Sequence, residues 1–232
     1  MHCVAIIPAR GGSKRIPRKN IKPFVGKPII GYSIEAALQS GLFDRVIVST
    51  DDSEIAEVAR SFGAEIPFLR PARLADDHAG TNAVVKHCLA WLQENGEPAD
   101  YACCIYATAP FVRVEYLEQG YQRLVETGKS YAFSVTSFPF PIQRALRINQ
   151  EGFVEALYPE MIPARSQDLE EAYHDAGQFY WGRAAAFMND VVTFSAESVP
   201  VVLPRHLVQD IDTMEDWRRA ELMYAALQEK VA

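Results

Sequence analysis

Residues 4–20 read VAIIPARGGSKRIPRKN. The first four residues form a short, continuous apolar run, which is typical of a strand buried in a parallel sheet. A loop rich in glycine and basic residues follows directly, from Arg10 to about Lys22. Gly11 and Gly12 are expected to turn the backbone with positive φ and to present N–H groups to an anion. This stretch therefore predicts an α/β fold with an anion-binding loop after its first strand.

Strand and helix patterns alternate through the first half of the chain. Further strands are expected at 45–49, 65–69, 101–106 and 130–136. Helices are expected at 28–38, from Asp51 or Asp52 to Arg60, at 81–93 and at 114–125. Their boundaries are indicated by Pro28, Gly41, Gly63, Thr81 and Gly128. Such alternation gives βαβ units, a mostly parallel sheet and helices on both faces, with ligands bound beyond the carboxyl ends of the strands.

Residues 139–173 interrupt this order. The segment is rich in proline and shows only weak strand patterns, near 143–148 and 153–157. It is interpreted as an insertion, serving as a lid or as a dimerisation arm. Strands at 177–181 and 199–203 and a last helix at 213–228 follow it. The sequence therefore predicts a single domain over residues 1–232 with one small irregular insertion.

Composition and charge exclude several classes of protein. The chain has 232 residues, of which 49% are hydrophobic, enough for one sizeable core. A net charge of −7 argues against a nucleic-acid partner, because such proteins usually carry a basic excess. We find no apolar stretch of about 18 residues and no signal peptide. We therefore expect a cytoplasmic protein that makes no contact with a membrane. The cysteines form no C-x-x-C pair and are expected to be buried thiols: Cys3, Cys88, Cys103 and Cys104.

The basic loop is the sharpest chemical signal in the sequence. Five cations stand close together on an otherwise acidic chain: Arg10, Lys14, Arg15, Arg18 and Lys19. Backbone donors and basic side chains of this kind suit a triphosphate. The loop matches neither the P-loop pattern nor the dinucleotide fingerprint. The alternative is a solvated basic loop, which its position after a buried strand disfavours.

A second signal is the pair Asp210 and Asp212. Residues two apart on a strand point to the same face, so both carboxylates can converge on one point. A hard divalent cation such as Mg²⁺ relieves the repulsion between them. The alternative is that Asp212 only begins the last helix and Asp210 is solvated, and the residues alone leave both interpretations open.

Several segments in order resemble the acylneuraminate cytidylyltransferases, the enzymes that make CMP-sialic acids. These segments are the basic loop and residues 49–52, 70–72, 107–113 and 210–217. Residues 134–146 and 174–181 are similar to the branch of the family that activates pseudaminic acid. The resemblance runs along nearly the whole chain and implies a Rossmann-like, three-layer nucleotidyltransferase fold. It also implies transfer of CMP from CTP to the anomeric hydroxyl of an acidic nine-carbon sugar, with release of pyrophosphate.

The resemblance further implies which residues form the site. Arg10, Lys14, Asp210 and Asp212 are expected to be catalytic, with the two aspartates holding Mg²⁺. The nucleotide-binding set is expected to be Ala9, Arg10, Gly11, Gly12, Ser13, Lys14, Lys19, Asn20, Arg70, Thr81 and Ala107. The sugar-binding set is expected to be Tyr106, Gln143, Arg144, Arg165, Gln167, Asp175, Gln178 and Tyr180. A homodimer is expected as well, with the 139–173 region crossing to the partner.

The sequence departs from the sialic acid branch at a position that contacts the sugar. Tyr106 stands where that branch commonly has glutamine, and Ala176-Gly177 replaces a common Asn-Gly pair. These changes favour a different nonulosonic acid, most simply pseudaminic acid. The alternatives are a cytidylyltransferase for N-acetylneuraminic, legionaminic or 3-deoxy-manno-octulosonic acid, and a non-catalytic nucleotide-binding module.

Overall fold

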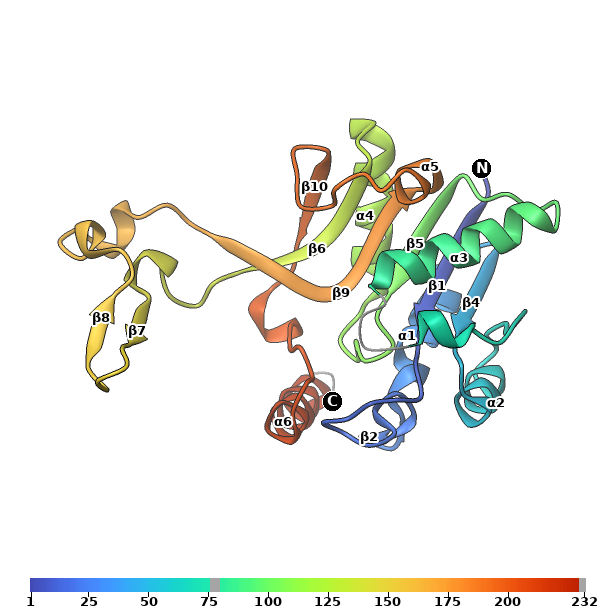
Figure 1. Ribbon diagram of the computed structural model, residues 1–232, viewed down its shortest axis with the longest axis horizontal. Helices are drawn as coiled ribbons and strands as arrows, with labels where there is room; N and C mark the ends of the chain where they lie inside the picture. Colours follow the sequence, from blue (N-terminus) through green and yellow to red (C-terminus); the bar gives the residue numbers. More distant parts are fainter. Residues whose placement is uncertain (76–79, 230–232) are drawn as a thin grey trace.

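The computed structural model describes residues 1–75 and 80–229, and its centre is a six-stranded sheet (Figure 1). The strand order is β10-β6-β9-β5-β1-β4. β9 is antiparallel to both of its neighbours, and the other pairs are parallel. The strands are β1 (Cys3–Pro8), β4 (Arg45–Ser49), β5 (Tyr101–Ile105), β6 (Tyr131–Ser137), β9 (Tyr173–Arg183) and β10 (Ser198–Val202). The mostly parallel α/β fold expected from the sequence is confirmed.

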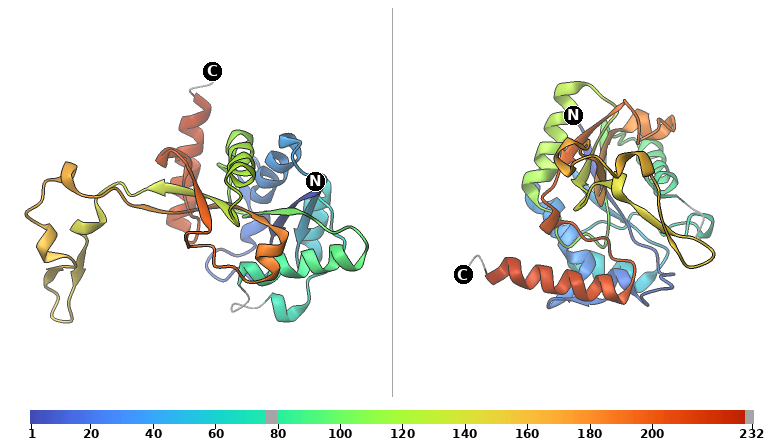
Figure 2. Two further views of the ribbon diagram at one scale, coloured as in Figure 1. Left: turned by 90° about the horizontal axis from the view of Figure 1, so that it is seen from above. Right: turned by 90° about the vertical axis from the view of Figure 1, so that its left-hand side faces the viewer.

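Helices cover both faces of the sheet (Figure 2). Alternate residues of the buried strands serve the two faces, because Ala5 and Ile7 belong to one core cluster whereas Val4 and Ile6 belong to the other. Helices α1, α2 and α4 pack in the first cluster, and α3 and α5 pack in the second. The helices are α1 (Ile29–Ser40), α2 (Ser53–Ser61), α3 (Thr81–Glu94), α4 (Val114–Thr127), α5 (Ala184–Met188) and α6 (Met214–Glu229). The four cysteines are buried free thiols, as expected.

A third, smaller core lies below the sheet, where α6 packs on the first connecting loop. Ile16 from the basic loop and Ile211 from the acidic segment are both fully buried there with Trp217 of α6. The short hairpin of β2 (Pro23–Phe24) and β3 (Lys27–Pro28) contributes Phe24 to the same core. This packing joins the beginning of the chain to its end.

Two details of the predicted elements are wrong. Residues 65–69 do not form a strand, since Glu65 makes a single bridge to Ile47 and Pro67 lacks the N–H that would continue the ladder. Thr81 does not cap α3, because Gly80 occupies the cap position and Thr81 is the first helical residue. The other boundaries agree closely. Asp52 accepts a hydrogen bond from the Ile55 N–H at 3.0 Å and caps α2.

The segment predicted to be an insertion forms an arm that projects from the body (Figures 1 and 2). β6 and β9 run out together as far as the pair of Ser137 with Tyr173, and the chain between them makes the arm. It holds a hairpin of β7 (Leu146–Ile148) and β8 (Val154–Ala156). Large apolar side chains are exposed along it: Phe140, Leu146, Ile148, Phe153, Val154 and Leu157. Within residues 1–75 and 80–229, none of the helices has the length and apolar character needed to cross a membrane.

Gly120 lets α4 approach the sheet closely. A Cβ at this position would lie 2.8 Å from Cδ1 of Trp181 and 3.0 Å from Cε2 of Phe179, two rigid rings in the core. We expect Gly120→Ala to lower the free energy of unfolding by about 1–3 kcal/mol, the usual cost of overpacking. Urea unfolding of the two proteins measures this. Gly152→Ala is a poor control because Gly152 has φ 86°, whereas Gly12, with open space around its Cβ position, offers a suitable one. Equal stability of Gly120→Ala and the wild type would contradict the close approach.

Candidate active site

A polar cavity of about 490 Å³ opens beyond the carboxyl ends of β1, β4 and β5. It takes residues from the basic loop, from the start of α3, from the segment after β5 and from the chain before α6. Its lining residues are Pro8, Arg10, Ser13, Lys14, Arg15, Lys19, Asn20, Arg70, Thr81, Val84, Tyr106, Ala107, Thr108 and Asp212. Most of the residues expected to bind the nucleotide are therefore brought together in one place. Ala9, Gly11 and Gly12 support the loop and do not line the cavity.

The two glycines of the basic loop do not have the backbone conformation expected from the sequence. Neither Gly11 nor Gly12 has a positive φ; the left-handed residue of the loop is Arg18, with φ 55°. Gly11 is required by crowding, because a Cβ there would lie 2.8 Å from Oδ2 of Asp52. The Gly11 N–H donates to Oδ1 of Asp51 at 3.0 Å. The loop is thus fitted closely against the start of α2.

Arg18 points toward α2 and not into the cavity. Its guanidinium donates to Oδ1 of Asp52 at 3.0 Å and also pairs with Glu54. Hydrogen bonding from Arg18 is the main reason that the pKa of Asp52 is lowered. Of the five loop cations, Arg18 therefore fixes the loop, and the other four line the cavity.

Two buried polar side chains hold the walls of the cavity. The Asn20 amide donates to the Arg10 carbonyl at 2.9 Å, which fixes the backbone that carries Arg10. The Arg70 guanidinium donates to Oγ of Ser49 at 3.1 Å and to the Ser49 carbonyl. Burial lowers the pKa of Arg70. Both side chains still line the cavity, so each can contact a ligand while it holds the adjoining loop.

Asp212 faces the loop cations across the cavity. Its Oδ2 lies 2.9 Å from Nη2 of Arg15, and its Oδ1 lies 3.4 Å from Nζ of Lys19. Lys19 also donates to the Ile211 carbonyl at 2.7 Å. The burial of Ile16 and Ile211 in one small core explains how the cationic and acidic segments meet. The two segments that the sequence places almost 200 residues apart therefore share one cleft.

The acidic pair lies in the loop between the 3₁₀ turn Arg205–Leu207 and α6 and not on a strand, which corrects the expectation. Asp210 lines a neighbouring cavity of about 370 Å³, and the buried Ile211 separates it from Asp212. Desolvation, and after it the charge of Asp212, raises the pKa of Asp210. The backbone of Asp212 is fixed by Asp216, whose Oδ2 accepts from the Asp212 N–H at 3.2 Å and from the Thr213 N–H at 2.8 Å. The chain that carries Asp212 is thus fixed at the start of α6.

A smaller cavity of about 190 Å³ adjoins the first, with Thr81 and Tyr106 on the shared wall. The Tyr180 hydroxyl donates to Oδ2 of Asp175 at its edge. The lining residues are Thr81, Asn82, Val85, Cys104, Tyr106, Asp175, Tyr180, Phe187, Thr193 and Phe194. Phe187, Thr193 and Phe194 were not anticipated, because they lie in α5 and in the turn after it, where the sequence carries no motif.

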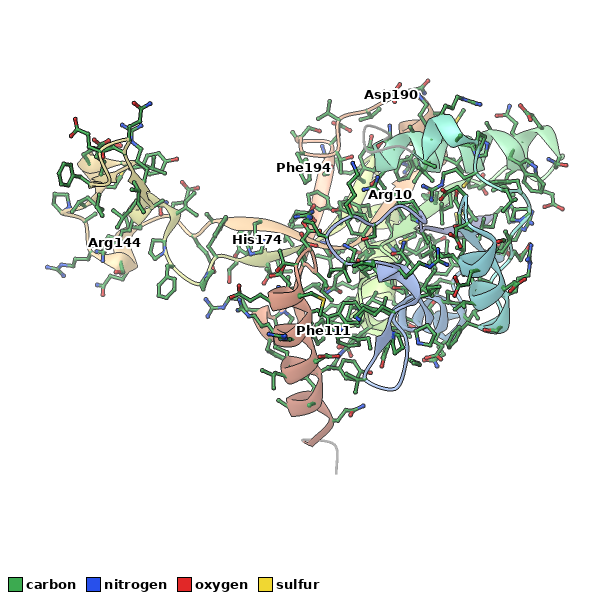
Figure 3. All side chains as sticks on the ribbon, turned by 60° about the horizontal axis from the view of Figure 1, so that its bottom comes forward. Arg10, Phe111, Arg144, His174, Asp190 and Phe194 are labelled. Carbon is green, nitrogen blue, oxygen red and sulfur yellow. The ribbon has the colours of Figure 1, made fainter. Side chains whose placement is uncertain are left out.

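The remaining residues expected at the sugar site are elsewhere in this chain. Gln178 is buried, and its amide donates to the Leu207 carbonyl, so it supports the chain leading to Asp210. Gln143 and Arg144 donate to backbone carbonyls within the arm, at 3.0 and 2.9 Å. Arg165 and Gln167 lie in the same arm. Arg144 is at the far end of the molecule from Arg10 (Figure 3), so the arm residues do not reach the cavity of their own chain.

Comparison with known proteins agrees with this geometry. The cytidylyltransferase family model matches residues 4–139, which include the basic loop and the segment after β5. The chain belongs to the cytidylyltransferase family.

Similarity to known proteins covers nearly the whole chain. It is 47% identical to a pseudaminic acid cytidylyltransferase of Campylobacter jejuni subsp. jejuni, over 97% of each chain. It is 33% identical to a CMP-N,N'-diacetyllegionaminic acid synthase of Legionella pneumophila, over 99% of each chain. Among solved structures, a CMP:2-keto-3-deoxy-manno-octonic acid synthetase in complex with CTP superposes with a TM-score of 0.71 at 19% identity, covering 97% of this chain and 99% of the other. This last likeness confirms the nucleotidyltransferase fold.

Proposed function

We propose that the protein transfers CMP from CTP to the anomeric hydroxyl of pseudaminic acid and releases pyrophosphate. The observation that carries the proposal is the cleft in which Arg15 and Lys19 face Asp212, since a cationic wall and a carboxylate across one cavity suit a metal-bound triphosphate. Identity of 47% to a pseudaminic acid cytidylyltransferase over 97% of each chain supports the choice of sugar. Buried free thiols are consistent with action in the reducing cytoplasm.

The larger cavity would hold the nucleotide. Arg10, Lys14, Arg15 and Lys19 line it and would neutralise the phosphates, while Ser13 offers a hydroxyl donor. Asn20, Arg70, Thr81 and the backbone of Ala107 line the part of the wall left for the cytosine and the ribose. A volume of about 490 Å³ is within the range of nucleotide-sized ligands.

The acidic pair fits a magnesium ion. Mg²⁺ is usually bound in nucleotide sites by one or two carboxylates together with substrate phosphates. Asp212 lines the larger cavity and would supply one carboxylate, and Asp210, which lines the neighbouring cavity, would supply the second. Burial, and after it the charge of Asp212, raises the pKa of Asp210, and a bound cation would favour the ionised form of this carboxyl. A bound magnesium ion would supply Lewis-acid polarisation of the phosphate. Within the described residues no larger cluster of metal-binding side chains occurs, so phosphate oxygens and water would complete the coordination.

The smaller cavity would hold part of the sugar acid. Its apolar wall, formed by Val85, Phe187 and Phe194, suits the methyl group of an acetamido substituent, whereas Tyr106 and Asp175 supply polar contacts. The cavity adjoins the nucleotide pocket at Thr81 and Tyr106. A sugar bound there would present its anomeric carbon toward the phosphates.

The reaction then depends on alignment and charge neutralisation. The anomeric hydroxyl would lose its proton to water, and its oxygen would form a bond to the α-phosphorus while the bond from that phosphorus to the bridging oxygen breaks, and pyrophosphate leaves. Arg10 and Lys14 would stabilise the negative charge that grows on the departing pyrophosphate. The walls formed by Asn20 and Arg70 would keep the two substrates in line.

A panel of sugars tests this function. CTP and Mg²⁺ would be incubated with pseudaminic, N,N'-diacetyllegionaminic, N-acetylneuraminic and 3-deoxy-manno-octulosonic acids, and pyrophosphate release would be followed. We expect the highest kcat/KM with pseudaminic acid. A higher kcat/KM with another sugar would assign that sugar as the substrate. Tight CTP binding without turnover of any sugar would reject an enzymatic role.

We further propose that residues 139–173 are part of a homodimer interface. Phe140 and Ile148 are 78% and 77% exposed, and Phe153 and Val154 are each 65% exposed, which is unusual for so many apolar groups in one short segment. Arg165 and Gln167 cannot reach the cavity of their own chain, whereas an arm extended toward a second copy could bring them to its sugar site. A guanidinium is well suited to the carboxylate of a sugar acid.

Mixed dimers distinguish an arm that serves its partner from one that does not. Arg165→Ala and Asp212→Ala subunits are each expected to be nearly inactive alone. In a mixed dimer with crossing arms, one site receives both an intact Asp212 and an intact Arg165, so random mixing should restore about a quarter of the wild-type activity. Pyrophosphate release after co-expression measures this. No recovery, although mixed dimers form, would show that each arm serves its own chain.

A further inference from the structure

The turn between α5 and β10, residues 189–197, forms one wall of the smaller cavity. Thr193 and Phe194 of this turn line the cavity. Phe194 and Val192 are 66% and 65% exposed, and the Phe194 ring packs edge-on against Phe133 with its centroid 5.3 Å away. Burial of apolar surface therefore contributes little to the position of this wall, which depends instead on hydrogen bonds at the ends of the turn.

Two side chains of α3 hold the start of the turn through Asp190. Nδ2 of Asn82 donates to Oδ1 of Asp190 at 2.9 Å, and Nζ of Lys86 donates to Oδ2 at 2.6 Å. Asn82 and Lys86 are four residues apart, so they lie on the same face of the helix. Both oxygens of the carboxylate are therefore bound to α3, beside which Asp190 lies (Figure 3).

The backbone at Asp190 favours this contact. Asp190 has φ 53°, a left-handed conformation that aspartate adopts more readily than most residues. Its N–H donates to the Phe187 carbonyl at 3.2 Å, and the Val191 N–H donates to the Ala186 carbonyl at 3.0 Å, so these bonds close the end of α5. The chain reverses at Asp190 and directs the carboxylate toward α3.

The other end of the turn is held separately. The Thr193 carbonyl accepts from the Ser195 N–H at 3.0 Å and from the hydroxyl of Ser198, the first residue of β10. The turn is thus bound to α3 at one end and to β10 at the other. Phe194 lies between these two attachments, so the position of its ring depends on both.

Helix α3 is also the wall that the two cavities share. Thr81 lines both cavities, whereas Val84 lines the larger one and Val85 lines the smaller one. The contact of Asp190 with α3 therefore sets how far the turn lies from the helix that separates the two substrates.

We propose that Asp190 is a positioning residue for the sugar acid, because it holds the wall that carries Phe194 against α3. Within the described residues, neither Asp190 nor Lys86 lines the smaller cavity, so both act through the turn. A sugar that covers Phe194 binds more tightly when this wall is already in place, because no binding energy is lost in ordering it. The inference rests on the proposed function, since it requires the sugar to occupy this cavity.

Asp190→Gly removes the contact and keeps the turn, because glycine adopts a positive φ without strain. We expect the KM for the sugar to rise about threefold to tenfold, a moderate effect because the Asp190 side chain is 66% exposed. The kcat and the Kd for CTP should stay within about twofold of the wild type. Asp190→Asn keeps the shape and one acceptor oxygen, so its KM should lie between the two.

A double-mutant cycle tests whether the effect acts through α3. Lys86→Ala breaks the same contact from outside the smaller cavity, so it should raise the sugar KM in the wild type and add little in the Asp190→Gly background. Glu97→Gln, which loses a carboxylate from an exposed pair with Arg45, is the control and should keep the wild-type KM. Hydrogen exchange needs no substrate: the amides of residues 191–197 should exchange faster in Asp190→Gly, whereas those of α4 should not.

Several outcomes would overturn the proposal. One is a sugar KM for Asp190→Gly within about twofold of the wild type, and another is additivity of Asp190→Gly and Lys86→Ala. Unchanged exchange in residues 191–197 would contradict it, as would a lower kcat with an unchanged KM, which indicates loss of folded protein. A wild-type protein that turns over no sugar of the panel would instead reject the proposed function, and with it this role for Asp190. If the wild type prefers another sugar of the panel, the cycle is measured with that sugar.

Discussion

Asp212→Asn is expected to lower kcat about a thousandfold while CTP binding in the absence of metal is retained or strengthened. The loss follows from the proposed magnesium site, because polarisation of a phosphate by a metal ion contributes several kcal/mol and each factor of ten in rate corresponds to about 1.4 kcal/mol. The gain in metal-free binding follows from the ion pairs, since Arg15 and Lys19 contact Asp212 and would become available to the phosphates.

Steady-state pyrophosphate release and calorimetry with CTP alone measure the two effects separately. Glu215→Gln is the matched control: Glu215 is an exposed acid in the first turn of α6, and its replacement should leave both quantities unchanged. A variant that simply unfolds would lose CTP binding together with activity. If Asp212→Asn kept kcat within a few-fold of the wild type, Asp212 would have no role in the chemical step.

The sequence predicted the sheet and most of its helices because their signals are local. The apolar run of β1, the Asp52 cap and the glycines at the ends of α1 and α4 each act over a few residues. The two failures have different causes. Pro67 acts locally, because it removes a ladder hydrogen bond from a segment with a strand-like composition, whereas Gly11 avoids a clash with a side chain 41 residues away.

The candidate site was predicted in part, and the unpredicted part depends on tertiary packing. The loop cations and Asp212 can be recognised as motifs in the sequence. They are brought into one cleft because Ile16 and Ile211 are buried in the same small core, and the spacing of residues in the sequence does not predict that contact. Arg165 and Gln167 fall within residues 139–173, which the sequence marked as an insertion, but the sequence did not show that this segment projects away from the body of its own chain. Phe194 lies after α5 in a turn without any pattern, so only the folded chain places it at the smaller cavity.

Arg10→Ala is expected to lower kcat by about 10²–10³, the loss seen when one group that stabilises developing charge is removed. Arg10 follows β1 directly and lines the nucleotide cavity, and the amide of Asn20 holds its carbonyl at 2.9 Å. The guanidinium is therefore carried on a fixed backbone at the wall where we propose that the phosphates of CTP bind. Steady-state kinetics at saturating CTP and sugar measure the effect, and calorimetry with CTP shows whether ground-state binding changes.

Two further variants show whether Arg10 acts on the transition state. Arg10→Lys keeps the charge but loses the planar pair of donors, so its kcat should lie between those of the wild type and Arg10→Ala. Arg60→Ala removes an exposed arginine at the end of α2 and should have wild-type kinetics. If Arg10→Ala raised the KM for CTP and left kcat unchanged, Arg10 would stabilise bound CTP and the transition state equally. A fall in kcat with little change in CTP affinity would instead show that Arg10 interacts most strongly with the charge that appears as pyrophosphate departs.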